Sequence, residues 1–271
     1  MNDMDEAQLK AYLQPRASEA HKGDFGHVLI VGGQPGMLGA TLLAGEAAAR
    51  CGAGCVSIAS LDPQPQVLLA RRPELMCHAV AQSSDIDPLL AKATVIVVGP
   101  GLGQSDAAQW LLRRALAAEL PTVIDADALN LIAHGVVDIS TVQKRRWILT
   151  PHPGEAARLL SCSVAEIQAA RAASAQALSE KYNAVVVLKG AGSLIAAPDA
   201  ELSRVTQGNP GMASGGMGDV LSGVIAALLA QGLTAEKSAA LGAYLHAKAA
   251  DQAAQQLGER GLLAVYVGVN P

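Results

Sequence analysis

The sequence predicts a doubly wound α/β fold, in which helices cover both faces of a mainly parallel sheet. Short apolar runs alternate with longer segments of helical periodicity, as in successive β-α units. Most of the short runs are β-branched and show little polar alternation, which is typical of strands buried on both faces. Hydrophobic residues make up 51% of the chain but aromatic residues only 3%. The core is therefore aliphatic, which suits close packing of helices on a sheet.

The predicted strands and helices alternate along most of the chain. The predicted strands are His27–Val31, Cys55–Ala59, Val95–Val98, Val123–Ile124, Trp147–Leu149, Ala184–Leu188 and Ser193–Ala196. The predicted helices are Ala40–Cys51, Ser105–Ala118, Ala126–His134, Gly154–Leu160, Val164–Lys181, Gly216–Gln231 and Thr234–Leu257. No helix separates Ser193–Ala196 from the apolar piece Leu202–Thr206, so we expect these two to form an antiparallel edge.

Length and charge exclude several classes of protein. The 271 residues are expected to form a single domain, residues 1–271, because open α/β sheets often reach this size. A net charge of −4 argues against general nucleic-acid binding, and the basic run Lys144–Arg146 is too short to change this. The acidic N-terminus is the reverse of a signal peptide, and Val220–Ala230 is shorter than the ~18 residues of a membrane span. The four cysteines have neither zinc-site nor disulfide-framework spacing, so a cytoplasmic location is expected.

Polar motifs follow five of the predicted strands. In doubly wound sheets, ligands bind outside the carboxyl ends of the strands. The motifs at these ends are Gly32–Gly39, Gly99–Gly103, Asp125–Asn130, Thr150–Glu155 and Lys189–Ser193. Glycine or acid/histidine clusters at five strand ends exceed what turn formation requires, so the sequence predicts a binding site along this edge.

Two of these motifs allow a structural and a functional interpretation. Gly32–Gly39 lacks the spacing of a dinucleotide fingerprint and the lysine of a P-loop. Taken alone it favours a flexible turn, although its glycines and Ala40 would let backbone amides approach a ligand. Gly99–Gly103 carries three glycines directly before a helix, where free amides favour anions. A structural turn explains this segment equally well.

Acidic and histidine side chains follow the next two strands. Asp127 is explained as a first-turn acid that favours the helix dipole. Asp125, nearest the strand end, is the candidate for a magnesium contact through water. His152 stands between two prolines, and this constraint favours a ligand contact. Zinc is not predicted, because no His or Cys partner lies at ligand spacing.

The strongest signal is the segment Gly208–Gly223. Five glycines precede or accompany Asp219, and an apolar helix starts at once. A glycine-lined helix N-terminus offers backbone N–H groups to a phosphate, and a carboxylate there can accept the proton of an attacking hydroxyl. A simple helix cap needs far less glycine, so we interpret Asp219 as a catalytic base.

Together these motifs resemble a known family. The Gly-x-Gly-Asp end of Gly208–Asp219 resembles the anion hole and catalytic Asp of the ribokinase-like superfamily. Asn209–Asp219, with Lys22–His27, Gly99–Gly103, Val123–Asn130, Thr150–Glu155 and Lys189–Ser193, resembles the ADP-dependent NAD(P)H-hydrate dehydratase family. The resemblance runs from about Lys22 to Leu257. Ser214 stands where the family usually has Thr, and the segment after Leu263 departs from the family pattern.

The resemblance implies a fold, a set of site residues and an assembly. The fold is a ribokinase-like three-layer α/β/α architecture with a mainly parallel central sheet. Hydrated NAD(P)H is contacted by Ala40, Gly103, His152 and Asp219. ADP is held by Lys189, Gly190, Ala191, Gly192, Ser193 and Gly218, and the anion hole comprises Gly215, Gly216, Met217 and Gly218. The family is typically magnesium-dependent and tetrameric. Many members carry an epimerase domain before this one; only about twenty residues precede Lys22, so epimerisation is expected from a separate protein.

The implied reaction is an ADP-dependent dehydration of S-NADH-hydrate or S-NADPH-hydrate that releases AMP and phosphate. Asp219 takes the proton of the C6 hydroxyl while that oxygen attacks the terminal phosphate of ADP, and phosphate then leaves. The sequence leaves two alternatives open: a ribokinase-like kinase for small alcohols such as hydroxyethylthiazole or hydroxymethylpyrimidine, and a non-catalytic nucleotide sensor. It also leaves open ADP against ATP, and NADH-hydrate against NADPH-hydrate.

Overall fold

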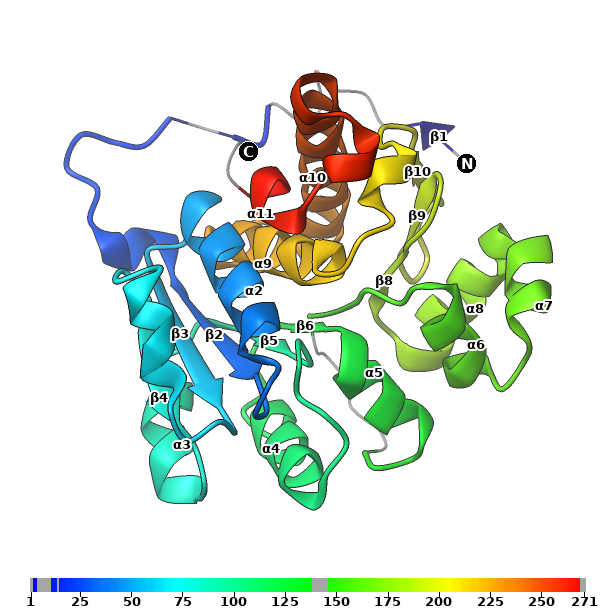
Figure 1. Ribbon diagram of the computed structural model, residues 1–271. Helices are drawn as coiled ribbons and strands as arrows, with labels where there is room; N and C mark the ends of the chain where they lie inside the picture. Colours follow the sequence, from blue (N-terminus) through cyan, green and yellow to red (C-terminus); the bar gives the residue numbers. More distant parts are fainter. Residues whose placement is uncertain (1, 4–10, 14, 138–145, 269–271) are drawn as a thin grey trace.

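The computed structural model describes residues 2–3, 11–13, 15–137 and 146–268. Within these residues the strands form one ten-stranded sheet in the order β1-β10-β9-β8-β7-β6-β5-β2-β3-β4 (Figure 1). The strands are β1 Asn2–Asp3, β2 His27–Gly32, β3 Cys55–Ser60, β4 Met76–Ala79, β5 Val95–Val98, β6 Thr122–Ile124, β7 Trp147–Leu149, β8 Val185–Leu188, β9 Ser193–Ala196 and β10 Ser203–Val205. The seven strands from β8 to β4 in this order are parallel to one another. Strands β9 and β10 pair antiparallel, as predicted, and the short strand β1 lies beyond β10 at the edge.

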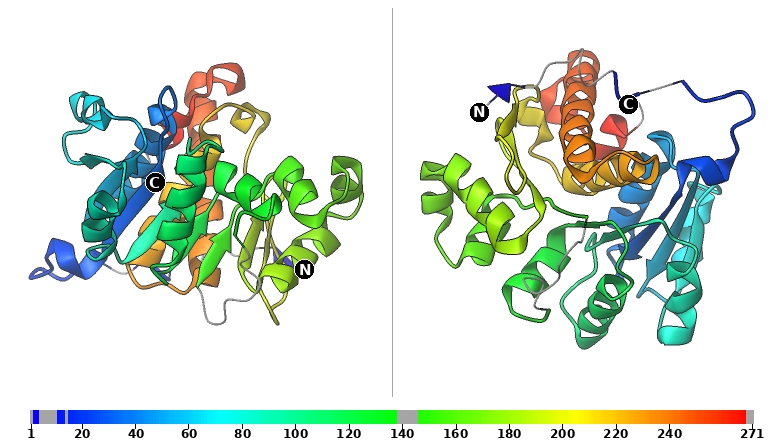
Figure 2. Two further views of the ribbon diagram at one scale, coloured as in Figure 1. Left: turned by 90° about the horizontal axis from the view of Figure 1, so that it is seen from below. Right: turned by 180° about the vertical axis from the view of Figure 1, so that it is seen from behind.

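Helices cover both faces of this sheet, as Figure 2 shows from two further sides. The helices are α2 Leu38–Arg50, α3 Ser83–Leu90, α4 Asp106–Leu116, α5 Ala126–Ala133, α6 Pro153–Leu160, α7 Val164–Ala169, α8 Arg171–Tyr182, α9 Met217–Ala230, α10 Ala235–Leu257 and α11 Ala264–Val267. Short 3-10 turns are η1 Lys22–Phe25, η2 Pro65–Ala70, η3 Pro210–Met212 and η4 Glu259–Gly261. The predicted three-layer α/β/α architecture with a mainly parallel sheet is confirmed.

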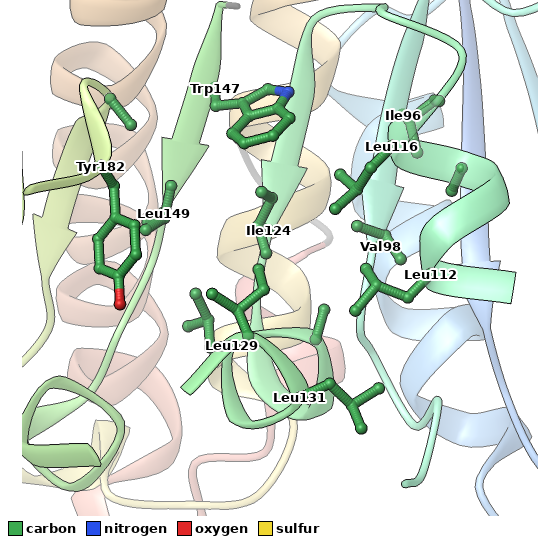
Figure 3. Close-up of a cluster of buried hydrophobic side chains, with 14 of the residues drawn as sticks. Ile96, Val98, Leu112, Leu116, Ile124, Leu129, Leu131, Trp147, Leu149 and Tyr182 are labelled. Carbon is green, nitrogen blue, oxygen red and sulfur yellow. The ribbon is translucent and has the colours of Figure 1, made fainter. Parts of the chain in front are cut away.

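The two faces of the sheet carry separate hydrophobic cores. Alternate residues of β2 point to opposite sides: Leu29 and Val31 pack with α3 to α8, whereas Val28 and Ile30 pack with α2, α9 and α10. Figure 3 shows part of the first core, where aliphatic side chains of β5, β6 and β7 meet those of α4 and α5. Every strand in the middle of the sheet is therefore buried on both faces, which explains its unbroken apolar run.

Small residues allow α2 and α9 to pack closely. A Cβ atom at Gly223 of α9 would lie 2.1 Å from the backbone oxygen of Ala44 in α2. Only glycine permits this approach. The aliphatic composition, with few aromatic rings, favours close packing of helices in the same way. Because α9 begins at the predicted catalytic segment, this contact fixes that segment relative to the sheet.

Three elements differ from the sequence prediction. Strand β4 is a partly exposed edge strand and α3 contains Pro88, so neither shows the pattern of a buried strand or an ordinary helix. The predicted helix Val164–Lys181 is interrupted at Ala170, whose φ of −136° is not helical. The break turns Arg171 toward the carbonyl groups that follow β8, a tertiary contact with no local sequence signal.

The segment after Leu263 packs on the helical layer. It forms α11, and Ala264 and Val267 are buried against α9 and α10. No helix in the part of the chain that the structure describes is both long and apolar enough to span a membrane.

Candidate active site

The glycine turns after β2 and β5 lie against each other. The amide of Gly33 donates to the Pro100 carbonyl at 3.0 Å, and that of Gln34 to the Gly101 carbonyl at 2.7 Å. These turns belong to adjacent strands whose following helices, α2 and α4, cover opposite faces. The reversal creates a crevice at the carboxyl edge of the sheet, where α/β proteins bind ligands.

Ala40 and Gly103 both lie beside this crevice. Ala40 packs against Gly101. The amide of Gly103 donates to Asp127 Oδ2 at 2.8 Å. Asp127 lies in the first turn of α5, as predicted. It also holds the glycine turn after β5 through Gly103, a contact that was not predicted. Since the Gly103 amide is engaged, a ligand would meet Gly103 through its Cα or carbonyl.

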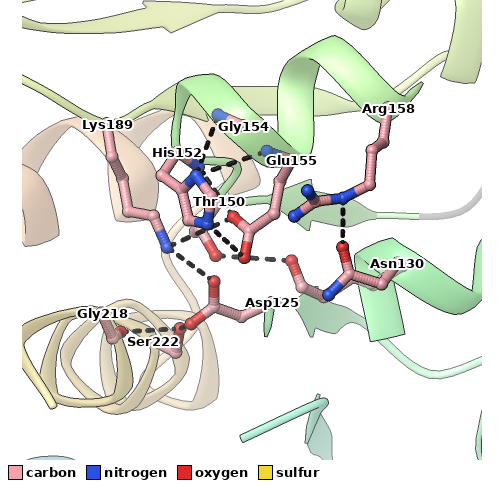
Figure 4. A network of polar contacts seen from close by, with 11 residues as sticks. Asp125, Asn130, Thr150, His152, Gly154, Glu155, Arg158, Lys189, Gly218 and Ser222 are labelled. Atoms are coloured by element: carbon pink, nitrogen blue, oxygen red, sulfur yellow. Dashed lines mark hydrogen bonds and ion pairs between the residues drawn. The ribbon is translucent and has the colours of Figure 1, made fainter. Parts of the chain in front are cut away.

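A buried ion pair forms the floor of the site (Figure 4). Lys189 Nζ donates to Asp125 Oδ1 at 2.8 Å, and the Ser222 hydroxyl donates to Asp125 Oδ2 at 2.8 Å. The Asp125 side chain is 1% exposed and that of Lys189 is 20% exposed. Burial alone raises the pKa of Asp125, but the Lys189 charge and the hydrogen bonds outweigh it and hold this pKa below its usual value. Asp125 is therefore a buried anion, tied to β8 and α9.

Glu155 is a second buried carboxylate beside Lys189. Its Oε2 lies 3.8 Å from Lys189 Nζ and accepts the amide of His152 at 2.8 Å. The His152 ring caps α6, because its Nδ1 accepts the amides of Gly154 and Glu155 at 3.0 and 3.3 Å. Nδ1 is thus unprotonated, and Nε2 carries the proton that faces Glu155 Oε1 at 3.2 Å. The imidazole remains half exposed, so a ligand can contact its outer edge.

The N-terminus of α9 lies directly against the ion pair. A Cβ atom at Gly218 would lie 3.1 Å from Lys189 Nζ and 3.5 Å from Asp125 Oδ2. Gly216 has a φ of +89°, and a Cβ there would lie 2.4 Å from Leu43 Cδ1. No side chain caps α9, so its first-turn amides are available to an anion. The predicted anion-hole residues Gly215, Gly216, Met217 and Gly218 form this uncapped turn.

Asp219 lies in the first turn of α9 and is half-buried. Burial raises the pKa of Asp219 to about 7, and the Asp125 charge adds to this effect while Lys189 opposes it. More distant charges on Asp127 and Glu155 act in the same direction as Asp125. A carboxylate with a pKa near neutrality is well suited to accept a proton from a substrate.

The turn after β8 exposes the backbone that the resemblance assigns to ADP. Gly190 and Ala191 are exposed, while the Ser193 hydroxyl donates to the Gly190 carbonyl at 3.2 Å. Arg171 supports the turn by donating to the carbonyls of Leu188, Lys189 and Gly192. The Lys189 amine points inward to Asp125. This lysine therefore connects the turn expected to bind the nucleotide with the N-terminus of α9.

A separate set of hydrogen bonds anchors the loop before α9. Asp251 of α10 accepts the amide of Gly208 and the side-chain amide of Asn209, both at 2.9 Å. Asn209 Oδ1 in turn accepts the Gly211 amide at 3.0 Å. The Ser214 hydroxyl donates to the Leu262 carbonyl at 3.1 Å, a bond that a Thr hydroxyl could also make. These bonds hold the glycine segment against α10.

Sequence reasoning missed several side chains of this network. Glu155 had a signal, because it stands three residues after His152 in a capping-box arrangement. Ser222 also had one, as a hydroxyl one turn after Gly218 on an otherwise apolar helix. Arg171 and Asp251 had none, since each acts on a segment distant in sequence. His246 is buried on α10, and burial with the Lys189 charge lowers its pKa to about 4.

The residues do not form a dedicated metal cage. Within the described ranges, no group of three or more His, Cys, Asp or Glu side chains is placed to hold a metal ion. Both oxygens of Asp125 already accept hydrogen bonds. A magnesium ion at this site would therefore need to bring most of its ligands with it, as an ion bound to a nucleotide does.

Comparison with known proteins agrees with this geometry. Residues 28–268 match the family model for NAD(P)H-hydrate dehydratase. The chain is 52% identical to the bifunctional NAD(P)H-hydrate repair enzyme of Coxiella burnetii, over 93% of this chain and 51% of that protein. It thus spans about half the length of such bifunctional relatives. It is 42% identical to the ADP-dependent (S)-NAD(P)H-hydrate dehydratase of Neisseria meningitidis, over 93% of this chain and 86% of that protein.

Solved structures give the same result. A ribokinase-like superfamily protein of Enterococcus faecalis superposes with a TM-score of 0.89 at 30% identity, over 98% of this chain and 92% of that one. An ADP/ATP-dependent NAD(P)H-hydrate dehydratase of Bacillus subtilis, co-crystallised with ATP and Mg²⁺, superposes with a TM-score of 0.87 at 31% identity, over 98% and 95%. The predicted ribokinase-like fold is confirmed, and the chain belongs to the NAD(P)H-hydrate dehydratase family.

Proposed function

We propose that this chain is an ADP-dependent dehydratase of S-NADH-hydrate and S-NADPH-hydrate that releases AMP and phosphate. The observation that carries the proposal is the position of Asp219 on the uncapped, glycine-lined N-terminus of α9. There a carboxylate whose pKa is raised to about 7 adjoins backbone amides that favour phosphate.

The first step is a phosphoryl transfer to the substrate. Asp219 accepts the proton of the C6 hydroxyl while that oxygen attacks the terminal phosphorus of ADP, and the bond to the AMP oxygen breaks. The first-turn amides of α9 stabilise the charge on the transferred group. Lys189 lies beside Gly218 and lends positive charge to the same place. A magnesium ion bound to the nucleotide would supply further charge neutralisation.

The second step is an elimination that needs little from the protein. Phosphate is a much better leaving group than hydroxide, so the lone pair of the ring nitrogen expels it from C6. Loss of a proton from the adjacent ring carbon restores the dihydronicotinamide. Ala40, Gly103 and the outer edge of His152 are proposed to hold the nicotinamide half, and the turn Lys189–Ser193, with Gly218, the ADP.

The proposal extends to the setting of the reaction. Asp125 is the residue proposed to contact, through water, a magnesium ion that would be bound mainly by ADP. The family resemblance supports a homotetramer. An enzyme confined to the S-epimer needs a supply of that epimer, so we propose cooperation with an NAD(P)H-hydrate epimerase. A single cytoplasmic domain remains the expectation from composition.

The test is turnover of hydrated NADH with ADP and magnesium, followed through the near-ultraviolet band of NADH together with AMP and phosphate. Wild-type protein should restore NADH with stoichiometric AMP and phosphate. Asp219→Asn should reduce kcat by about 10²- to 10⁴-fold, because the amide cannot accept the proton. Glu236→Gln makes a comparable acid-to-amide change in the exposed first turn of α10 and should leave turnover intact. Near-normal turnover in Asp219→Asn would refute the base assignment, and a stable phosphoester without NADH would indicate a kinase.

A further inference from the structure

A second cavity opens on the same edge of the sheet as the candidate active site. It has a volume of about 630 Å³, within the range of small-molecule sites. Its lining residues follow the carboxyl ends of β2, β3, β4 and β5, and they are Gln34, Pro35, Leu61, Val80, Ala81, Gln82, Ser83, Ser105, Ala107 and Trp110. None of these side chains carries a charge. The cavity therefore suits a neutral ligand group with both polar and apolar faces.

Gln34 connects this cavity to the crevice between the two glycine turns. Its side-chain oxygen lies against Gly103, where an added Cβ would be only 2.1 Å away. The backbone amide of Gln34 donates to the Gly101 carbonyl on the same turn as Gly103. A ligand that contacts Gly103 and extends away from α9 would thus enter the cavity past Gln34.

The cavity has an aromatic wall. Trp110 of α4 is half-buried in the core on one side and lines the cavity on the other. The side-chain amides of Gln34 and Gln82 and the hydroxyls of Ser83 and Ser105 complete the wall. A purine base combines an apolar face with hydrogen-bonding edges, and base–aromatic contact favours its binding.

We propose that this cavity binds the adenosine half of the hydrated dinucleotide, with the adenine base against Trp110. This inference rests on the proposed function. The hydrated nicotinamide must lie near Asp219, and ADP is assigned to the turn after β8 on the other side of α9. The remaining half of the dinucleotide is then directed along the opposite part of the edge, toward β2, β3 and β4, where the cavity lies.

The test compares two substrates that differ only in the adenosine monophosphate portion: hydrated NADH and hydrated reduced nicotinamide mononucleotide. Ala107→Trp and Ser83→Trp each fill the cavity, from α4 and α3 respectively, at exposed positions. Ala117→Trp places the same side chain at the exposed far end of α4 as a control. Each filling variant should lower the ratio of kcat/KM for hydrated NADH to that for the mononucleotide by about 10-fold, while the control keeps the ratio.

A binding measurement separates this inference from the proposed function. Binding of NADH itself, measured by calorimetry, should weaken about 10-fold in both filling variants and stay unchanged in Ala117→Trp. If wild-type protein turns over neither substrate but NADH binding still weakens, the proposed function is wrong and the cavity assignment stands. If folded Ala107→Trp and Ser83→Trp keep wild-type ratios and NADH affinity, or raise only the KM for ADP, the cavity assignment is wrong.

Discussion

Replacing Lys189 by Met tests whether the Asp125–Lys189 pair is a structural element of the site. The change keeps much of the side-chain volume but leaves the Asp125 carboxylate, which is 1% exposed, with only neutral hydrogen-bond donors such as the hydroxyls of Ser222 and Thr150. Removing one partner of a buried ion pair typically costs 3–5 kcal/mol. Because the Lys189 side chain is 20% exposed, we expect the lower end, about 3 kcal/mol. With a urea m value of about 3 kcal/mol/M, the unfolding midpoint should fall by about 1 M.

The cost should depend on pH in a defined direction. In the wild type the pKa of Asp125 is lowered, so the pair contributes stability above the unfolded pKa of about 3.9, and this contribution is lost as pH falls through the folded pKa. Without Lys189, burial raises the pKa of Asp125. The penalty in Lys189→Met is then full above that raised pKa and is relieved as pH falls through it. The free energy of unfolding of the variant should therefore approach that of the wild type on mild acidification.

A double-mutant cycle provides the decisive comparison. Asp125→Asn removes the buried charge, so in the double variant the loss of Lys189 should cost much less than in the single variant, with a coupling of about 1–3 kcal/mol. Urea unfolding followed by circular dichroism measures all four proteins. If the two single costs add to within about 0.5 kcal/mol, or if the Lys189→Met cost is independent of pH, the two groups are not coupled and the reasoning is refuted.

Two further predictions concern activity. At saturating ADP, kcat/KM for the hydrated dinucleotide should rise with pH through about 7 as Asp219 loses its proton. Because Lys189 lowers the pKa of Asp219, Lys189→Met should move this limb to higher pH, and a limb that stays in place would contradict the assignment. Asp251→Ala removes the acceptor for Gly208 and Asn209 and should lower kcat by about 10- to 100-fold through misplacement of the loop before α9. Asp251→Asn, which keeps one acceptor, should recover part of kcat; equal kcat in all three proteins would exclude a positioning role.

Local pattern was sufficient to predict most of the sheet. β5, β7 and β9 have the predicted bounds. A strand buried on both faces is apolar at every position, as β5 and β7 are, and β9 is apolar after Ser193. β4 and α3 escaped prediction for the opposite reason: an exposed edge strand and a Pro-containing helix lack that pattern. The glycines of the segment Gly208–Gly223, which made it the strongest signal in the sequence, also have a structural reason. Gly216 needs a positive φ, and Gly223 needs the close approach of the Ala44 backbone, so both have to be glycine.

The sequence by itself determined the α/β architecture, and it was sufficient to propose the edge of the sheet for the site and Asp219 as its base. These properties depend on periodicity and on backbone freedom, which neighbouring residues express directly. Only the tertiary structure decided that Lys189 pairs with Asp125, that Glu155 and Ser222 join them, and that Asp127 holds Gly103. These side chains come from different strand ends and from α9, so their mutual distances, and the pKa of Asp219 that depends on them, exist only once the sheet and its helices have assembled.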